Sequence, residues 1–124
     1  MAPRLQLTSV TLGCPDAAAL ANFYARLLGG EPNPSDPGWA QLSTESDGGR
    51  FTVNFEFEEQ WTPPVWPAEP GHQFASQHLD ILVDDLPAAV DHALACGARL
   101  APHQPQESVR VMFDPAGHPF CLFL

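Results

Sequence analysis

Apolar and polar side chains first alternate and then change to helical spacing at the start of the chain. Residues 5–14 alternate between the two kinds and are rich in β-forming types, which predicts a strand. Asp16 can then cap a helix whose apolar residues recur every three or four positions, and Gly29 and Gly30 supply a left-handed stop. The apolar face predicted for this helix comprises Leu20, Phe23, Tyr24, Leu27 and Leu28.

The same order of patterns returns in the second half of the chain. Residues 74–83 are predicted as a strand, and Asp85 can cap a helix that has Pro87 in its first turn and ends at Gly97. The side chains expected to face inward from this helix are Val90, Ala93 and Leu94. The repetition of strand, capped helix and terminal glycine indicates two similar modules.

Shorter apolar runs follow each helix. After a loop predicted at 32–38, the remaining strands are predicted at 39–44, 51–57, 99–101, 109–113 and 119–124. Each copy therefore has the order strand, helix, strand, strand, and we expect this order to be completed by one more short strand. This order is typical of an α+β domain with two open, mostly antiparallel sheets and with helices on their outer faces.

A segment with neither pattern separates the two copies. Residues 59–73 contain four prolines, which disfavour both a helix and a central strand. We therefore expect a stiff linker between a first module at about 5–58 and a second module at about 74–124. This linker carries two tryptophans, Trp61 and Trp66.

Composition narrows the class of protein. The 124 residues, of which 44% are hydrophobic, suffice for a single domain over 1–124 with a core that needs no metal or disulfide. A formal net charge of −10, with five arginines and no lysine, repels phosphate backbones and anionic lipids, so no nucleic acid and no membrane surface is expected as a partner. No apolar run approaches the roughly 18 residues of a membrane span, and no signal-peptide pattern is seen, so we expect a cytoplasmic protein. The three cysteines have no CxxC spacing and are expected to be reduced thiols.

Several short segments carry a further signal when they are taken in order: the first strand ending at Asp16, then 23–29, 78–85, 97–98 and 114–120. Together they resemble the vicinal oxygen chelate (VOC) superfamily, which includes glyoxalase I, extradiol dioxygenases, and fosfomycin and bleomycin resistance proteins. The resemblance covers essentially the whole chain and is nearest to small glyoxalase-like proteins of unknown substrate. It implies two βαβββ modules whose paired, curved sheets enclose a ligand cleft, and it implies a homodimer.

The resemblance also implies where a divalent metal would bind, because metal-dependent members hold one with His and Glu side chains from four strands, two in each module. The first-strand position falls on Ser9, its counterpart in the second copy on His78, and the final-strand position on Cys121. The fourth position is Glu56 if the residues around it are matched to those around Cys121, and Val53 if it is counted from the preceding turn. The substitutions leave His78 and Glu56 as the ligands if a metal binds, with a Cys121 thiolate as a further donor. We therefore expect no cofactor.

A second set of side chains favours the binding of a small molecule. Strand alternation places Glu56 on the face opposite Val53, where it would line the cleft. With Trp39, Trp61 and Trp66 nearby, the cleft would suit a planar aromatic or a cationic ligand through stacking and charge pairing. The alternative is that the tryptophans cover the core or a partner subunit.

Three functions are consistent with these residues. The first is a metal-independent small-molecule binding protein, similar to bleomycin resistance proteins that act by sequestration, with the ligand buried between the modules and oriented by Glu56 and His78. The second is an enzyme, either a metal-dependent lyase, isomerase or dioxygenase or a metal-free one with His78 as base. The third is a protein-interaction module that uses Trp61 and Trp66 and has no ligand, which predicts that large apolar side chains fill the space beside His78.

Overall fold

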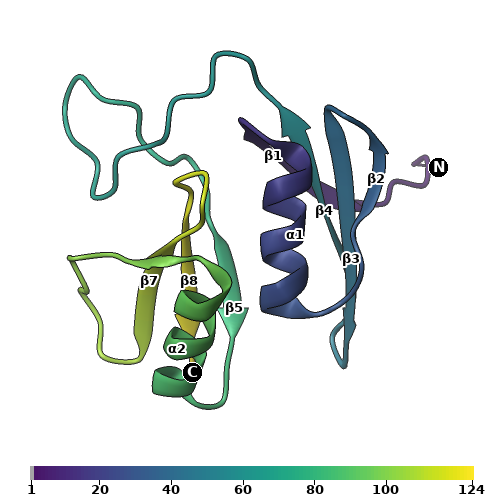
Figure 1. The fold of residues 1–124 in the computed structure, drawn as a ribbon. Coiled ribbons are helices and arrows are strands. Elements are labelled where there is room, and N and C mark those ends of the chain that lie inside the picture. The colour runs from purple at the N-terminus through teal and green to yellow at the C-terminus, as the bar shows by residue number, and fades with distance from the viewer. Residues whose placement is uncertain (1) are drawn as a thin grey trace. The chain divides into compact units, whose positions relative to one another are not determined.

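The computed structural model describes residues 2–124, apart from the side chains at positions 34 and 35, and divides the chain into two compact units (Figure 1). The first unit ends at Glu59 and the second runs from Gln60 to Leu124. The first contains β1 (Ser9–Cys14), α1 (Ala17–Leu28), β2 (Asn33–Asp36), β3 (Trp39–Ser46) and β4 (Gly49–Phe57). The second contains β5 (Leu79–Leu82), α2 (Leu86–Cys96), β6 (Arg99–Leu100), β7 (Val109–Phe113) and β8 (Pro119–Phe123).

The two units have the same topology. Their four-stranded sheets have the orders β1-β4-β3-β2 and β5-β8-β7-β6, which are equivalent when the elements of each unit are counted from its start. In each sheet the first strand pairs in parallel with the last, and the other neighbours are antiparallel. The structure thus confirms an α+β fold made of two βαβββ modules, and β2 is the additional short strand, lying within the loop expected at 32–38.

Both helices begin and end where the sequence predicts. The Asp16 carboxylate accepts a hydrogen bond from the Ala19 amide at 3.0 Å, and Asp85 accepts one from Ala88 at the same distance. These caps satisfy amides that have no partner inside the helix. No helix in residues 2–124 has the length and apolar character needed to cross a membrane.

In the first module, α1 buries its apolar side chains against β3 and β4. Leu20, Phe23 and Tyr24 are almost fully buried, and the Tyr24 ring stacks on Phe55 of β4 with 5.7 Å between the centroids. Leu28 was expected on this face but is 37% exposed, because it lies in the last turn of the helix. The apolar stripe of α1 therefore fixes which face of the first sheet is the core.

In the second module, β7 is buried on both faces. Met112 lies on the face covered by α2, whereas Val111 and Phe113 form a cluster with Ala101 on the other face. On α2, Ala93 is buried as expected, but the prediction for Leu94 is wrong. The buried stripe of α2 runs instead through Leu86, Ala93 and Cys96, which turns Leu94 outward to 44% exposure.

The first strand of each module is shorter than its alternating pattern predicts. β1 begins at Ser9, which is opposite Thr52 of β4, and Leu5 and Leu7 before it are 90% and 96% exposed. In the second module, Phe74 lies outside β5 and takes part in an isolated bridge with Val65. Alternation indicates that a segment can form a strand, but a strand also needs a neighbour to pair with.

The proline-rich segment 60–73 belongs to the second unit and packs on it through its tryptophans. The Trp61 indole Nε1 donates a hydrogen bond to the Ala116 carbonyl at 3.0 Å, and its ring lies 4.7 Å from that of His118. Trp66 packs against the cluster of Ala101, Val111 and Phe113. Both tryptophans thus contact their own module, Trp61 at the turn of Ala116 and Trp66 at the core cluster.

Gly117 tests how closely the proline-rich segment 60–73 packs on the rest of the second unit. Its φ is +102°, and a Cβ built there would lie 2.8 Å from the Pro63 Cβ, which is closer than real Cβ atoms approach. Gly97 has a similar φ of +113°, but a Cβ there would meet nothing closer than 4.0 Å. We expect Gly97→Ala to cost about 1–2 kcal/mol from backbone strain and Gly117→Ala to cost roughly 1–3 kcal/mol more from the collision.

The measurement is urea unfolding followed by tryptophan fluorescence in a Trp39→Phe background, in which the signal comes from Trp61 and Trp66, and these lie in the same unit as both glycines. Equal losses of stability in the two variants would show that Pro63 moves away from the new Cβ at no cost. The segment 60–73 would then not be fixed at the turn that contains Gly117.

Candidate ligand-binding site

A pocket of about 510 Å³ lies within the second module, on the sheet face opposite α2. Its apolar walls come from Trp66, Val109, Val111, Pro119 and Phe123. The polar side chains that line it include His78, Asp80 and Cys121. The sequence-predicted residues His78, Cys121 and Trp66 are thus brought together in one pocket.

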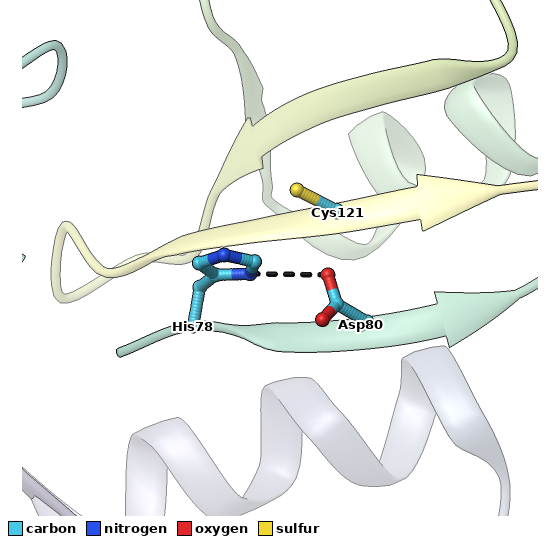
Figure 2. A group of neighbouring side chains, drawn as sticks. All are labelled: His78, Asp80 and Cys121. Atoms are coloured by element: carbon cyan, nitrogen blue, oxygen red, sulfur yellow. Dashed lines mark ion pairs between the residues drawn. The ribbon is translucent and has the colours of Figure 1, made fainter. Parts of the chain in front are cut away.

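His78, Asp80 and Cys121 form a compact polar cluster, in which Asp80 lies on β5, Cys121 on the neighbouring β8, and His78 directly before β5 (Figure 2). Asp80 of β5 is opposite Cys121 of β8 in the parallel register, and His78 lies two residues before Asp80, so all three are on the same side. His78 Nδ1 lies 3.0 Å from Asp80 Oδ1, and both side chains are about half exposed. One ligand atom from each of the three residues lies within 4.8 Å of the others.

The environment of Cys121 favours its neutral thiol. Burial raises the pKa of the thiol, and the charge of the Asp80 carboxylate and a hydrogen bond to it raise that pKa further. Both effects act against the thiolate, since burial and a neighbouring negative charge each disfavour a second negative charge. The expectation that Cys121 would be a thiolate donor is therefore not supported by its surroundings.

The pocket has no arginine among the described residues that line it, and the chain has no lysine. Arg110 of β7 alternates to the other face of its strand, where its Nη1 donates to the carbonyls of Gln106, Glu107 and Val109. Arg99 lies over the Phe113 ring, 5.2 Å from its centroid. Asp80 thus faces the pocket with the His78 ring 3.0 Å away and with no guanidinium among the described lining residues.

The internal repeat identifies the equivalent positions in the first module. Thr11 lies five residues before the helix cap Asp16, as Asp80 lies five before Asp85, and the register places Thr11 opposite Asn54. Asn54 is therefore the counterpart of Cys121. Neither of the two residues predicted from the sequence holds this position. Counting from the turn gave Val53 because the turns before β4 and β8 differ in length, and matching similar residues gave Glu56, which lies two positions past Asn54.

Asn54 is the centre of a neutral hydrogen-bond network. Its carbonyl oxygen accepts from Gln41 Nε2 at 2.8 Å, and its amide donates to the hydroxyls of Ser9 and Thr11 at 3.3 Å each. Asn54 is 7% exposed, so this network satisfies a buried amide. Ser9, a predicted site residue, lies in this network.

The remaining predicted residues of the first module lie on neighbouring strands. Trp39 of β3 is opposite Glu56 of β4 in the register, Glu56 is exposed and Trp39 is half-buried. In the second module, Trp61 lies on the turn at Ala116 rather than among the pocket-lining residues.

Sequence reasoning missed Asp80 and Asn54. The signal for Asp80 is its spacing: a residue two positions after His78 on a strand shares its face. A further polar pair lies at the turn between β7 and β8, where His118 Nδ1 is 2.8 Å from an oxygen of Asp114, which is 1% exposed. Asp114 Oδ1 also accepts from the amides of Ala116 and His118, so this pair holds the turn between β7 and β8.

A duplicated βαβββ fold with polar side chains on the sheet faces opposite the helices defines a protein of the VOC class. The chain belongs to the glyoxalase-like domain family, whose model matches residues 9–123. No curated protein matches the chain.

Solved structures share the fold at low identity. A protein from Burkholderia phytofirmans PsJN, described as a glyoxalase/bleomycin resistance protein/dioxygenase family enzyme, is 20% identical with a TM-score of 0.69, over 93% of this chain and 94% of that one. A fosfomycin resistance protein from Listeria monocytogenes, solved with Mn(II) and dihydroxypropylphosphonic acid, is 14% identical with a TM-score of 0.66, over 95% and 88%. A glyoxalase family protein from Enterococcus faecalis is 19% identical with a TM-score of 0.63, over 96% and 97%. At these identities the likeness concerns the fold alone.

The donor set does not fit a metal held at the four positions that the family resemblance implies. Those positions hold Ser9, Asn54, His78 and Cys121. A hydroxyl and an amide are neutral oxygen donors, and both already belong to the network around Asn54. Since the Cys121 thiol favours its neutral form, His78 is the one ready donor among these four.

The reactivity of Cys121 tests this description of the cluster. Because the thiolate is the nucleophile, a raised pKa moves the alkylation rate profile to higher pH than that of an ordinary cysteine. Asp80→Asn removes the carboxylate charge, so we expect its profile to move part of the way back, with the effect of burial remaining. The measurement is the rate of iodoacetamide labelling of the Cys121 peptide by mass spectrometry between about pH 7 and 10. An unchanged profile would mean that Asp80 has no influence on the thiol.

Proposed function

We propose that this protein binds a small, largely apolar molecule, aromatic or cationic, in the pocket of its second module, and that it does so without a metal ion. The observation that carries the proposal is the pocket of about 510 Å³, in which apolar walls surround the cluster of His78, Asp80 and Cys121. Ligand sites of this size, mostly apolar with a few converging polar groups, are typical of small-molecule binding proteins. The proposed role is sequestration in a cytoplasmic protein.

The open space beside His78 supports this proposal over a protein-interaction module. That alternative predicts large apolar side chains filling the space, and it relies on Trp61 and Trp66 as contacts. Trp61 donates its indole N–H to Ala116, and Trp66 packs on the core cluster, so the aromatic surface of both is partly used within the module. The contributions of Ser9, Glu56 and Trp39 to the ligand, and the homodimer, stay predictions.

A metal-dependent enzyme is the second candidate, favoured by one observation. His78, Asp80 and Cys121 offer nitrogen, oxygen and sulfur ligand atoms within 4.8 Å of one another, in a single module. Binding a cation there would have to displace the Cys121 proton and separate the His78–Asp80 pair. We therefore favour metal-free binding over a metal-dependent enzyme.

Mapping with two probes tests the pocket. Indole and benzylamine present an aromatic ring with a neutral or a cationic N–H group, and we expect both to shift the backbone amide resonances of β5, β7 and β8 in two-dimensional NMR. Cys121→Phe places a large side chain in the pocket and should weaken binding by about tenfold or more. The matched control is Cys96→Ala, because Cys96 is on α2 and away from the lining residues. Shifts spread evenly over the chain, or binding that survives Cys121→Phe, would contradict the proposal.

Metal binding is tested separately. We expect protein purified without chelator to contain no stoichiometric metal, and its melting temperature to be unchanged by Ni²⁺, Zn²⁺, Mn²⁺ or Fe²⁺. A ligand specific for the native state, at about 100 times its dissociation constant, would add about 2.7 kcal/mol and be seen. A stabilisation lost in His78→Ala but kept in His72→Ala, which alters an exposed histidine, would favour the metal-dependent enzyme instead.

A further inference from the structure

We propose that Asp80 makes this pocket selective for ligands that donate a hydrogen bond and carry no negative charge. The inference rests on the proposed function, small-molecule binding in the second module, and adds the chemical class of the ligand. Asp80 has two roles in this proposal. It is a positioning residue that orients the His78 ring, and its carboxylate is the negative charge that a ligand meets in the pocket.

The first step concerns the proton of the His78 ring. Oδ1 of Asp80 lies 3.0 Å from Nδ1. If Nδ1 were unprotonated, its lone pair would face a carboxylate oxygen at that distance, which is repulsive, so the proton is held on Nδ1. In the neutral ring, Nε2 is then the acceptor, and Figure 2 shows this nitrogen on the part of the ring turned away from Asp80.

The second step concerns what the pocket offers to a ligand. With Nδ1 facing Asp80, the ring presents an acceptor at Nε2, and the nearby carboxylate is an acceptor as well. The neutral Cys121 thiol is a weak donor, and Asp80 is its hydrogen-bond partner. The strong groups of this cluster thus accept hydrogen bonds, and a ligand that donates one is complementary to them, while Gln106 and Ser108 also line the pocket and can both donate and accept.

The third step concerns charge. No arginine is among the described residues lining the pocket, and the whole chain carries a formal charge of −10. An anionic ligand would meet the Asp80 carboxylate without a guanidinium or ammonium group to pair with. A neutral or cationic ligand meets no such cost.

The proton position can be measured without any ligand. We expect the ¹⁵N shifts of the His78 ring, recorded at about pH 8, above the range in which imidazoles usually titrate, to show the Nδ1–H form in the native protein. His78→Ala assigns the resonances. Asp80→Asn keeps an acceptor beside Nδ1 and should keep this form, whereas Asp80→Ala should move the ring toward the Nε2–H form. Both changes are at a half-exposed position, so the fold is expected to tolerate them.

Three probes that share one ring then measure selectivity: phenol donates a hydrogen bond, anisole does not, and benzoate is an anion. We expect phenol to bind about fivefold more tightly than anisole, and benzoate about threefold more weakly than anisole at low salt. In Asp80→Asn the penalty for benzoate should fall, because the carboxylate charge in the pocket is removed, while the preference for phenol remains. In Asp80→Ala the penalty should fall likewise and the preference for phenol should be lost.

The outcomes separate this inference from the proposed function. If the probes bind in the pocket but phenol and anisole bind equally, or the native ring is in the Nε2–H form, the inference is overturned and small-molecule binding stands. If none of the three probes, nor indole or benzylamine, binds at all, both are overturned.

Discussion

The candidate site depends on the parallel pairing of β5 with β8. Its register places Asp80 opposite Cys121, and strand alternation puts His78 on the same face. A slip of one residue would turn these side chains toward α2 and the apolar ones toward the pocket. Packing against α2 prevents such a slip, because Phe120 and Leu122 of β8 are buried on that face, with 0% and 1% exposure. Apolar packing under α2 therefore holds the polar cluster in place.

The two modules use one architecture for different chemistry. In the first, the position equivalent to Cys121 holds Asn54, whose amide is satisfied by Gln41, Ser9 and Thr11. A buried amide with internal partners needs no ligand to complete it. In the second, the Asp80 carboxylate and the His78 ring are half exposed and keep capacity for further hydrogen bonds. At the positions equivalent to Asp80 and Cys121, the first module thus holds the neutral Thr11 and Asn54.

The parts of this fold that can be predicted from the sequence are those determined by residues close to one another in the chain. The caps Asp16 and Asp85 and the stops at Gly29 and Gly97 act within a few residues of the helices they bound, so both helices are predicted closely. The counterpart of Cys121 is decided by pairing across a sheet, and matching similar triplets led to Glu56 instead of Asn54. The role of Asp80 likewise depends on a neighbour 41 residues away in the sequence. Alternation shows which side chains share a face of one strand, but it does not show which strand lies beside them.

Trp66 joins the stability of the second module to the shape of its pocket. Its ring packs edge-on against Phe113, with 6.5 Å between the centroids, and belongs to the cluster of Ala101, Val111 and Phe113. The same side chain is a wall of the pocket. A ligand that displaced Trp66 would expose part of this cluster to water, and each large apolar side chain so exposed costs about 1.5–3 kcal/mol. The apolar wall is thus fixed by the core, and discrimination between ligands is left to the polar groups that face it.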